Sequence, residues 1–194
     1  DYAVIAKGDS GPTKGDGTKI LDTYVPVGST KITVADPNKF KVGDQVIVTR
    51  KGNEDWIQDI GMKDIPPRKD GRDVKQWSPF NLDFENRITR IEGHTITLEI
   101  PIVNAIEKRY GGGSLYHYTD GRLSNVGIEN LRAVSFWEPN RYHNDDTRHV
   151  AGFLEINNAE DCWVSDITME HFYSQFGAIA MRRQSKQITV KDSS

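Results

Sequence analysis

The chain has 194 residues, of which 36% are hydrophobic and 27% charged, as is typical of a globular protein with one large domain or a domain with a smaller addition. Its formal net charge of −3 argues against a nucleic-acid-binding protein, which usually carries a basic surplus. No run of 18 apolar residues occurs, so no membrane span is predicted, and the single Cys162 excludes an internal disulfide and a cysteine-based metal cluster.

Residues 1–22 are predicted to form the approach to a first β-coil. The stretch GDSGPTKGDG at 8–17 is rich in turn-forming residues, and it lacks the strand and helix that flank a phosphate-binding loop. The chain starts with neither an initiator methionine nor a signal peptide, as a processed secreted protein or a fragment would. We therefore expect a secreted protein, located in the periplasm or outside the cell.

Residues 23–112 are predicted to form a small antiparallel β subdomain, inserted near the N-terminus. Apolar and polar residues alternate in Lys31–Val34 and in Gln45–Thr49, and residues 86–102 have the pattern of a hairpin around Glu92-Gly93. Short helical turns are expected within 55–62 and 101–110.

A long loop at 51–85 interrupts this subdomain. Its charges are of both signs, and its aromatic residues argue against disorder. Trp56 and Trp77 are candidate substrate-binding residues, because an indole can stack on a sugar ring. The alternative is that these rings hold the loop in place by packing.

Residues 113–194 repeat a rhythm of apolar, small and acidic positions. The segments VGIENL (126–131), CWVSDI (162–167) and ITVKDS (188–193) align column by column. The interior columns are Val126/Cys162/Ile188 and Ile128/Val164/Val190. An Asn/Asp column follows and predicts a turn after each strand. GFLEIN (152–157) aligns with GAIAMR (177–182), and SLYHY (114–118) is assigned as an earlier copy.

Short strands in coils of roughly 25 residues predict an all-β fold, a right-handed parallel β-helix in which stacked coils share one core. The spacing between equivalent residues widens from 26 to 36 where a loop insertion at 136–149 interrupts the coils. The last coil ends at Ser194 without a cap, so we expect the sequence to be part of a longer chain.

The coil segments GFLEINNAEDCWVSDITMEHF and GAIAMRRQSKQITVKDSS resemble the pectate-lyase-like superfamily of right-handed parallel β-helix proteins. The front half, with KVGDQVIVTRKGNEDWIQDIGM and YGGGSLYHYTDGR, is similar to the leading region of uncharacterised bacterial members that are predicted to be secreted. The resemblance implies polysaccharide lyases, glycoside hydrolases and esterases, and also phage tailspikes and adhesins. The arginine-proline pair of characterised pectate lyases has no counterpart in this sequence.

The insertion at 136–149 contains YHNDDTRH, with two carboxylates and two imidazoles that could supply acid and base groups beside a sugar. β-Elimination at a uronic acid needs a base for the proton at C5, for which His149 and His143 are the candidates. Asp146 is a further catalytic candidate, and Asp145 could bind Ca²⁺. The alternative is a solvated loop whose Asp and Asn side chains cap turns.

Basic and aromatic residues near this insertion are candidates for substrate contacts. Arg182 could neutralise the uronate carboxylate during catalysis, while Arg148 and Arg183 could bind the polymer. Trp137 and Tyr142 are further candidate platforms for sugar rings. The alternative for the arginines is an ordinary surface position at a turn.

We expect a carbohydrate-active protein that acts on an acidic polysaccharide, with a β-eliminating lyase as the main hypothesis. One alternative is a glycoside hydrolase, in which Glu155 pairs with Asp145 or Asp146 across the sugar. The other is a non-catalytic carbohydrate-binding, adhesin or tailspike-like module. Polysaccharide is the expected partner, and Ca²⁺ is the one candidate cofactor.

Overall fold

The computed structural model describes residues 2–138, 140, 150–172 and 177–194 of an all-β chain that divides into two compact units. Unit 1 comprises Asp1–Thr13 and Thr119–Ser194, and unit 2 comprises Lys14–Tyr118. Each unit is built from β-strands, and the one α-helix in the described ranges is α1 (Glu54–Asp59) of unit 2.

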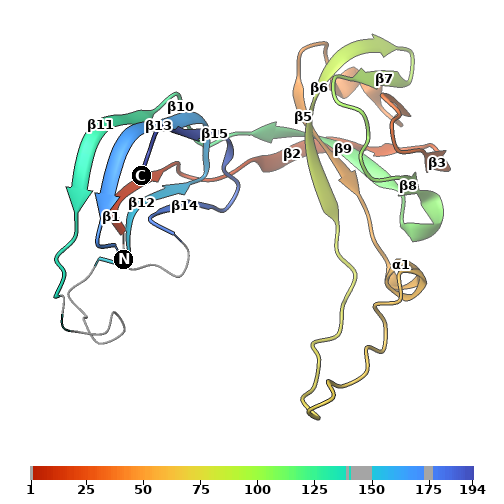
Figure 1. The fold of residues 1–194 in the computed structure, drawn as a ribbon. Coiled ribbons are helices and arrows are strands. Elements are labelled where there is room, and N and C mark those ends of the chain that lie inside the picture. Colours follow the sequence, from red (N-terminus) through yellow and green to blue (C-terminus); the bar gives the residue numbers. More distant parts are fainter. Residues whose placement is uncertain (1, 139, 141–149, 173–176) are drawn as a thin grey trace. The chain divides into compact units, whose positions relative to one another are not determined.

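Unit 1 consists of two parallel sheets (Figure 1). The first has the strand order β1-β12-β14, and in the second β13 pairs with β10, β11 and β15. The strands are β1 (Tyr2–Lys7), β10 (Leu123–Ser124), β11 (Gly127–Val134), β12 (Gly152–Asn157), β13 (Ala159–Glu170), β14 (Ile179–Arg182) and β15 (Lys186–Lys191).

The registers of these sheets confirm the predicted columns. Cys162 pairs with Ile188. The other confirmed pairs are Ile128 with Val164, Val164 with Val190, Leu154 with Ile179, and Ile156 with Met181. Equivalent residues of neighbouring parallel strands therefore stand directly opposite each other, so their side chains lie on the same face.

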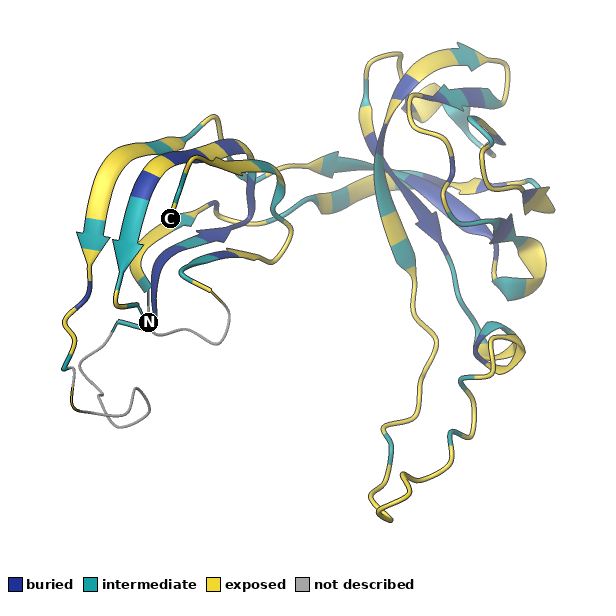
Figure 2. Cartoon of the chain, in the orientation of Figure 1, coloured by how far each residue is buried: buried dark blue, intermediate teal, exposed yellow. Residues whose placement is uncertain are grey.

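The core of unit 1 includes residues of both sheets. Leu154 and Ile156 of β12 are buried together with Val164 and Ile167 of β13. Cys162 is 5% exposed, which agrees with its predicted role as a small interior residue. Figure 2 shows the contrast between buried β12 and the largely exposed strands β11 and β15.

Left-handed backbone conformations recur at equivalent positions of neighbouring strands in unit 1. Asn130, Asp166 and Asp192 occupy one column, with φ of 54°, 53° and 48°. A second column contains Asn125, Asp161 and Gln187, with φ of 57°, 51° and 54°. Asn and Asp tolerate this conformation better than most residues. The prediction of a turn after each strand is wrong for Asn130 and Asp166, because both lie inside strands that bend and continue.

Unit 2 contains a sheet with the order β2-β9-β5-β6-β7-β4 and a smaller antiparallel pair, β3 with β8. Strand β5 runs antiparallel to both β6 and β9, and β7 runs antiparallel to β6 and β4. The strands are β2 (Thr13–Ile20), β3 (Tyr24–Val25), β4 (Lys31–Thr33), β5 (Gln45–Arg50), β6 (Leu82–Glu92), β7 (Thr95–Leu98), β8 (Ile106–Glu107) and β9 (Gly113–Thr119). The 3₁₀ turns are η1 (Pro37–Lys39) and η2 (Lys108–Tyr110).

The predicted hairpin at 86–102 is confirmed, with Glu92 opposite Thr95. Val46 and Val48 on β5 are fully buried in the core of unit 2, with Ile96 of the hairpin. These residues come from β-branched, alternating segments, which favour strands that pack on one face.

One strand assignment from the sequence is wrong. SLYHY (114–118) is not a coil of unit 1, because β9 pairs antiparallel with β5 in unit 2. Alternating apolar residues occur in parallel and antiparallel strands alike, so the pattern alone does not separate the two. The helical turn expected within 101–110 is present as the 3₁₀ turn η2, and β8 precedes it.

Candidate functional site

The outward-facing side chains of β11 and β13 form one surface, which we call the β11–β13 outer surface. Its defining residues are Gly127, Glu129 and Arg132 of β11 and Trp163 and Glu170 of β13. Ile128 and Val164 alternate with them and pack in the core. The surface belongs to unit 1 alone.

Trp163 lies across the neighbouring strand. It pairs with Gly127, and its indole occupies the space that a Cβ atom at position 127 would need. The indole Nε1 donates a hydrogen bond to the Glu129 carboxylate. The ring is therefore held in one orientation while Trp163 remains 37% exposed.

Arg132 and Glu170 form a two-pronged ion pair further along the same strands. Arg132 Nε lies 2.8 Å from Glu170 Oε1, and Nη2 lies 2.7 Å from Oε2. The hydrogen bond from Arg132 holds the pKa of Glu170 below its ordinary value, and the hydrogen bond to Glu170 raises the pKa of Arg132. Both groups are therefore charged at neutral pH.

Trp137 and His171 stack where the two strands end. Their ring centroids are 4.5 Å apart and their planes differ by 11°. Ser135 N donates to Glu170 O at 3.0 Å, which holds the segment after β11 beside the end of β13. Trp137 remains 46% exposed, and it is therefore a second supported aromatic ring at the end of the β11–β13 outer surface.

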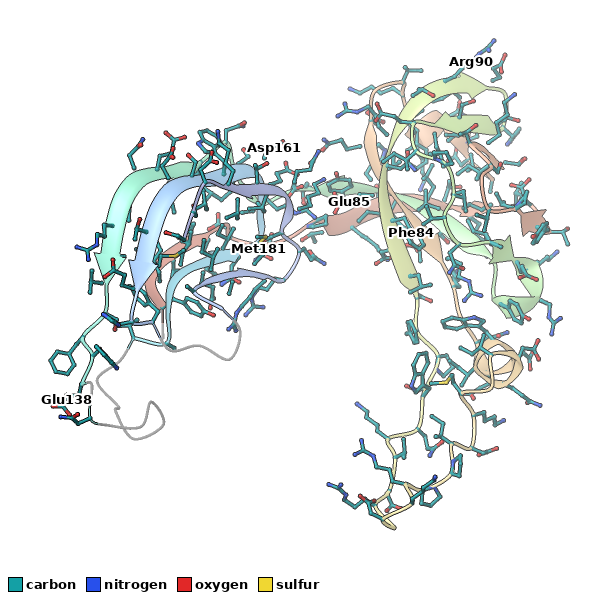
Figure 3. The ribbon with its side chains drawn as sticks, viewed as in Figure 1. Phe84, Glu85, Arg90, Glu138, Asp161 and Met181 are labelled. Atoms are coloured by element: carbon teal, nitrogen blue, oxygen red, sulfur yellow. The ribbon has the colours of Figure 1, made fainter. Side chains whose placement is uncertain are left out.

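The two aromatic rings are separated along the strands. Eight residue steps lead from Trp163 to His171, which is about 26 Å at most in extended conformation. In Figure 3, Asp161 is labelled near the start of β13, and Glu138 is labelled in the segment that follows β11. The surface is therefore elongated.

Arg182 was predicted to neutralise a uronate, and the structure places it beside Glu155. Arg182 Nε lies 3.4 Å from Glu155 Oε2, and its guanidinium carbon lies 5.4 Å from the centre of the Tyr2 ring. The Tyr2 hydroxyl and the Glu155 carboxylate both raise the pKa of Arg182. Glu155 also accepts a hydrogen bond from Asn157 Nδ2.

Arg183 has a different environment from its neighbour Arg182. Its backbone is left-handed, with φ of 57°, and it lines an open cavity of about 500 Å³. The other lining residues are Asp9, Ser10, Gly11, Asn158 and Gln184. The two arginines therefore do not meet at one group.

Trp56 and Trp77 belong to unit 2. The guanidinium carbon of Arg50 lies 4.1 Å from the centre of the Trp56 ring, and Trp56 also meets Phe80 at 4.9 Å. Trp77 is tilted against Phe80 at 5.8 Å. Their role as substrate-binding residues stays a prediction, and these contacts also fit the alternative that the rings hold the loop.

Six predicted site residues lie outside the described residues and stay predictions: Tyr142, His143, Asp145, Asp146, Arg148 and His149. In the described ranges, no three His, Cys, Asp or Glu residues are grouped so that they could hold a metal ion. The same ranges contain no helix with the length and apolar character that a membrane crossing requires.

Sequence reasoning missed Trp163, Arg132 and Glu170. The column-by-column alignment of VGIENL (126–131) with CWVSDI (162–167) puts Trp163 opposite Gly127, between the interior columns. A bulky aromatic residue beside a glycine in neighbouring coils is the signal that could have identified the platform. The Arg132–Glu170 pair joins positions 38 residues apart and has no comparable signal.

Comparisons with known proteins give structural neighbours only. No protein-family model and no curated protein sequence matches the chain. The Gp54 tailspike of Acinetobacter baumannii bacteriophage AP22, solved in complex with A. baumannii capsular saccharide, is 14% identical with a TM-score of 0.48, over 98% of this chain and 25% of that one. The Pseudomonas phage phi297 tailspike gp61 is 12% identical with a TM-score of 0.42, over 94% and 34%.

The tailspike protein gp49 from Pseudomonas phage LKA1 is 12% identical with a TM-score of 0.37, over 80% of this chain and 23% of that one. The chain thus spans from 23% to 34% of the length of these three neighbours. All three are phage tailspike proteins, and the resemblance to the pectate-lyase-like superfamily stays a prediction.

Proposed function

We propose that this chain is a carbohydrate-binding module that holds a polysaccharide along the β11–β13 outer surface, on the coils of a right-handed parallel β-helix. The observation that carries the proposal is the Trp163 ring, which is seated over Gly127 and hydrogen-bonded to Glu129. Long polysaccharides are found mainly outside the cell, so we also propose an extracellular location.

A fixed aromatic ring suits the binding of a sugar. The apolar C–H face of a pyranose ring packs on an indole, while its hydroxyl groups need polar partners. Because Glu129 already fixes the orientation of Trp163, little side-chain entropy is lost when a sugar stacks on the ring. The exposed part of the indole is therefore already oriented for stacking before a sugar binds.

The elongated arrangement favours a polymer over a single sugar. Trp137 offers a second ring, supported by His171. Between the two rings, the Arg132–Glu170 pair offers charged hydrogen-bonding groups to the hydroxyl groups of a sugar. A row of several sugar units could contact the Trp163 ring, the Arg132–Glu170 pair and the Trp137 ring together.

Two lysines on β15, the strand that pairs with β13 on the other side from β11, favour an acidic polymer as the ligand. Thr189 of β15 pairs with Trp163, and Lys186 and Lys191 flank it along the strand. Lys186 lies 3.1 Å from Glu160, whereas Lys191 is more exposed. Cations at the edge of a binding surface attract an anionic chain during encounter.

Among the described residues of unit 1, the side chains around Arg182 favour binding over catalysis. A lyase needs a cation that is available to the substrate carboxylate, and Arg182 lies beside Glu155. A hydrolase would need Glu155 as an acid or base, and this carboxylate already contacts Arg182 and Asn157. The lyase and hydrolase hypotheses depend on His143, His149 and Asp146 and stay predictions.

Binding to a panel of immobilised acidic and neutral polysaccharides tests the proposal. We expect Trp163→Ala to weaken binding at least about tenfold, with Tyr24→Ala, an exposed aromatic residue of β3 in unit 2, as the control that binds normally. Full binding by both Trp163→Ala and Trp137→Ala would overturn the proposal. Release of an unsaturated uronate from a polymer would instead put the lyase hypothesis first.

A further inference from the structure

We infer that unit 2 contains a phosphate-binding pocket, formed by three lysines around a glycine turn. The pocket has a volume of about 280 Å³. Its lining residues are Lys19, Ile20, Leu21, Asp22, Lys51, Lys108, Gly111, Gly112 and Gly113. This inference does not rest on the proposed function, because the pocket lies wholly in the other unit.

The three lysines come from different parts of the chain. Lys19 is in β2, Lys51 follows β5, and Lys108 begins η2. Among the described residues, no carboxylate forms an ion pair with any of the three ammonium groups. Three lysines along one pocket give it a positive potential, which attracts an anion.

One carboxylate lines the pocket, and it is already engaged. Asp22 Oδ2 accepts a hydrogen bond from Thr33 N at 2.6 Å. Three lysines and one aspartate among the lining residues give a net charge of +2. This balance matches a phosphate monoester or inorganic phosphate, which carries close to two negative charges at neutral pH.

The backbone that carries the lysines is fixed. Lys51 N donates to Gly112 O at 2.9 Å, and Lys108 N donates to Thr23 O at 2.9 Å. Lys19 O accepts from Ala35 N at 3.0 Å. The pocket is therefore formed before any ligand binds, so only the lysine side chains need to become ordered.

The glycine turn keeps the pocket open. Gly111 and Gly112 have φ of 101° and 67°, a conformation that glycine adopts without strain. A Cβ atom at position 111 would lie 3.2 Å from Lys51 Cβ. A side chain here would therefore strain the backbone and crowd the base of Lys51.

The volume limits the size of the ligand. Pockets for small molecules range from about 300 to 1,000 Å³, and this one is just below that range. It suits free phosphate or one phosphorylated sugar residue, and both share the dianionic phosphate group. Lysine is a common partner for phosphate because it acts as a compact point charge.

Titration of the full chain at low ionic strength tests the inference, with inorganic phosphate, glucose 6-phosphate and glucose as probes. We expect saturable binding of both phosphates, no binding of glucose, and at least about tenfold weaker phosphate binding in the Lys51→Ala/Lys108→Ala variant. Tighter binding of glucose 6-phosphate than of phosphate identifies a sugar ester as the ligand, and equal binding identifies the free ion.

Lys63→Ala/Lys69→Ala, in the exposed part of the 51–85 loop, is the matched control, because it removes the same charge away from the pocket. Equal weakening by this control would show general attraction and overturn the inference, as would the absence of saturable phosphate binding by the unmodified chain. If Lys51→Ala/Lys108→Ala does not fold, Lys19→Gln at the exposed position on β2 replaces it, with Lys63→Gln as the control that removes one charge.

Discussion

Trp163 of β13 covers Gly127, the residue opposite it on β11. Gly127 has no positive φ, so the glycine is needed there for its missing side chain and not for its backbone freedom. The indole is supported by the strand below it, and the hydrogen bond to Glu129 fixes its direction. A residue of any other type at 127 would have to displace the ring.

Gly127→Ala should therefore disturb the candidate site without unfolding the chain. We expect polysaccharide affinity to fall about tenfold as the indole is pushed away, with a change in stability within about 1 kcal/mol. The immobilised-polysaccharide assay measures the affinity. Denaturation followed by tryptophan fluorescence measures the change in stability. Gly15→Ala is the matched control, because a Cβ there meets no atom closer than 3.8 Å. Unchanged binding by Gly127→Ala would contradict the assigned platform.

Arg122 links neighbouring parts of unit 1 and should be important for its stability. Its side chain is 2% exposed, its Nε donates to Gln184 O at 2.7 Å, and its Nη1 lies 2.7 Å from Asp120 Oδ2. Arg122→Ala leaves these acceptors without their cation, so we expect a loss of about 3–5 kcal/mol in the free energy of unfolding.

Chemical denaturation measures this loss, and Arg90→Ala is the control. Arg90 pairs with Glu92 on the surface of unit 2 (Figure 3), and both side chains are at least half exposed. We expect this control to lose about 1 kcal/mol or less. Similar losses in the free energy of unfolding for both variants would show that the buried contacts of Arg122 stabilise the chain no more than an exposed ion pair does.

The pKa of Glu170 should depend on Arg132. The hydrogen bond from Arg132 lowers this pKa below the ordinary value of 4.5. A lowered pKa in the folded state means that the pair stabilises the fold above pH 4.5, and that this stabilisation is lost as the pH falls through the lowered pKa. Because the pair is exposed and screened by salt, the effect on stability is small.

Carboxyl NMR titration measures this dependence directly. In Arg132→Gln we expect the pKa of Glu170 to rise toward its ordinary value, while the carboxyls of unit 2 titrate as before. A Glu170 titration that does not change in Arg132→Gln would show that the two-pronged pair does not form in solution.

Cys162 should react with thiol reagents only when unit 1 opens. Its side chain is buried between strands and contacts Glu160 O at 3.2 Å through Sγ. We expect labelling by a thiol reagent to be at least about a hundredfold slower in the native chain than in denaturant. Rapid labelling of the native chain would contradict the stacked interior column.

The stacked columns were predictable because the interior positions repeat in type. Val164 and Leu154 lie in segments whose apolar residues alternate, and the same alternation returns 25 or 26 residues later. The same signal misplaced SLYHY (114–118), because β9 alternates in the same way but pairs within an antiparallel sheet. Periodicity gives the face of a residue, whereas the partner strand depends on tertiary structure.

The candidate site was harder to predict than the fold. Trp137 was identified as a candidate platform from its exposed loop, but its partner His171 could not be, because their contact depends on where two strands end together. Trp163 was not among the residues predicted for the site, although the alignment of CWVSDI with VGIENL puts it opposite Gly127. Arg182 was chosen for its charge, and the carboxylate of Glu155 beside it is not a sequence neighbour.

The indole N–H signals of the four tryptophans in an NMR titration test the proposed surface most directly. With an oligosaccharide cut from a polymer that binds in the panel, we predict saturable shifts for Trp163 and Trp137 of unit 1. The signals of Trp56 and Trp77 of unit 2 should stay in place and serve as the internal control. Shifts confined to Trp56 and Trp77, or no shift at Trp163 while the ligand binds, would contradict the account.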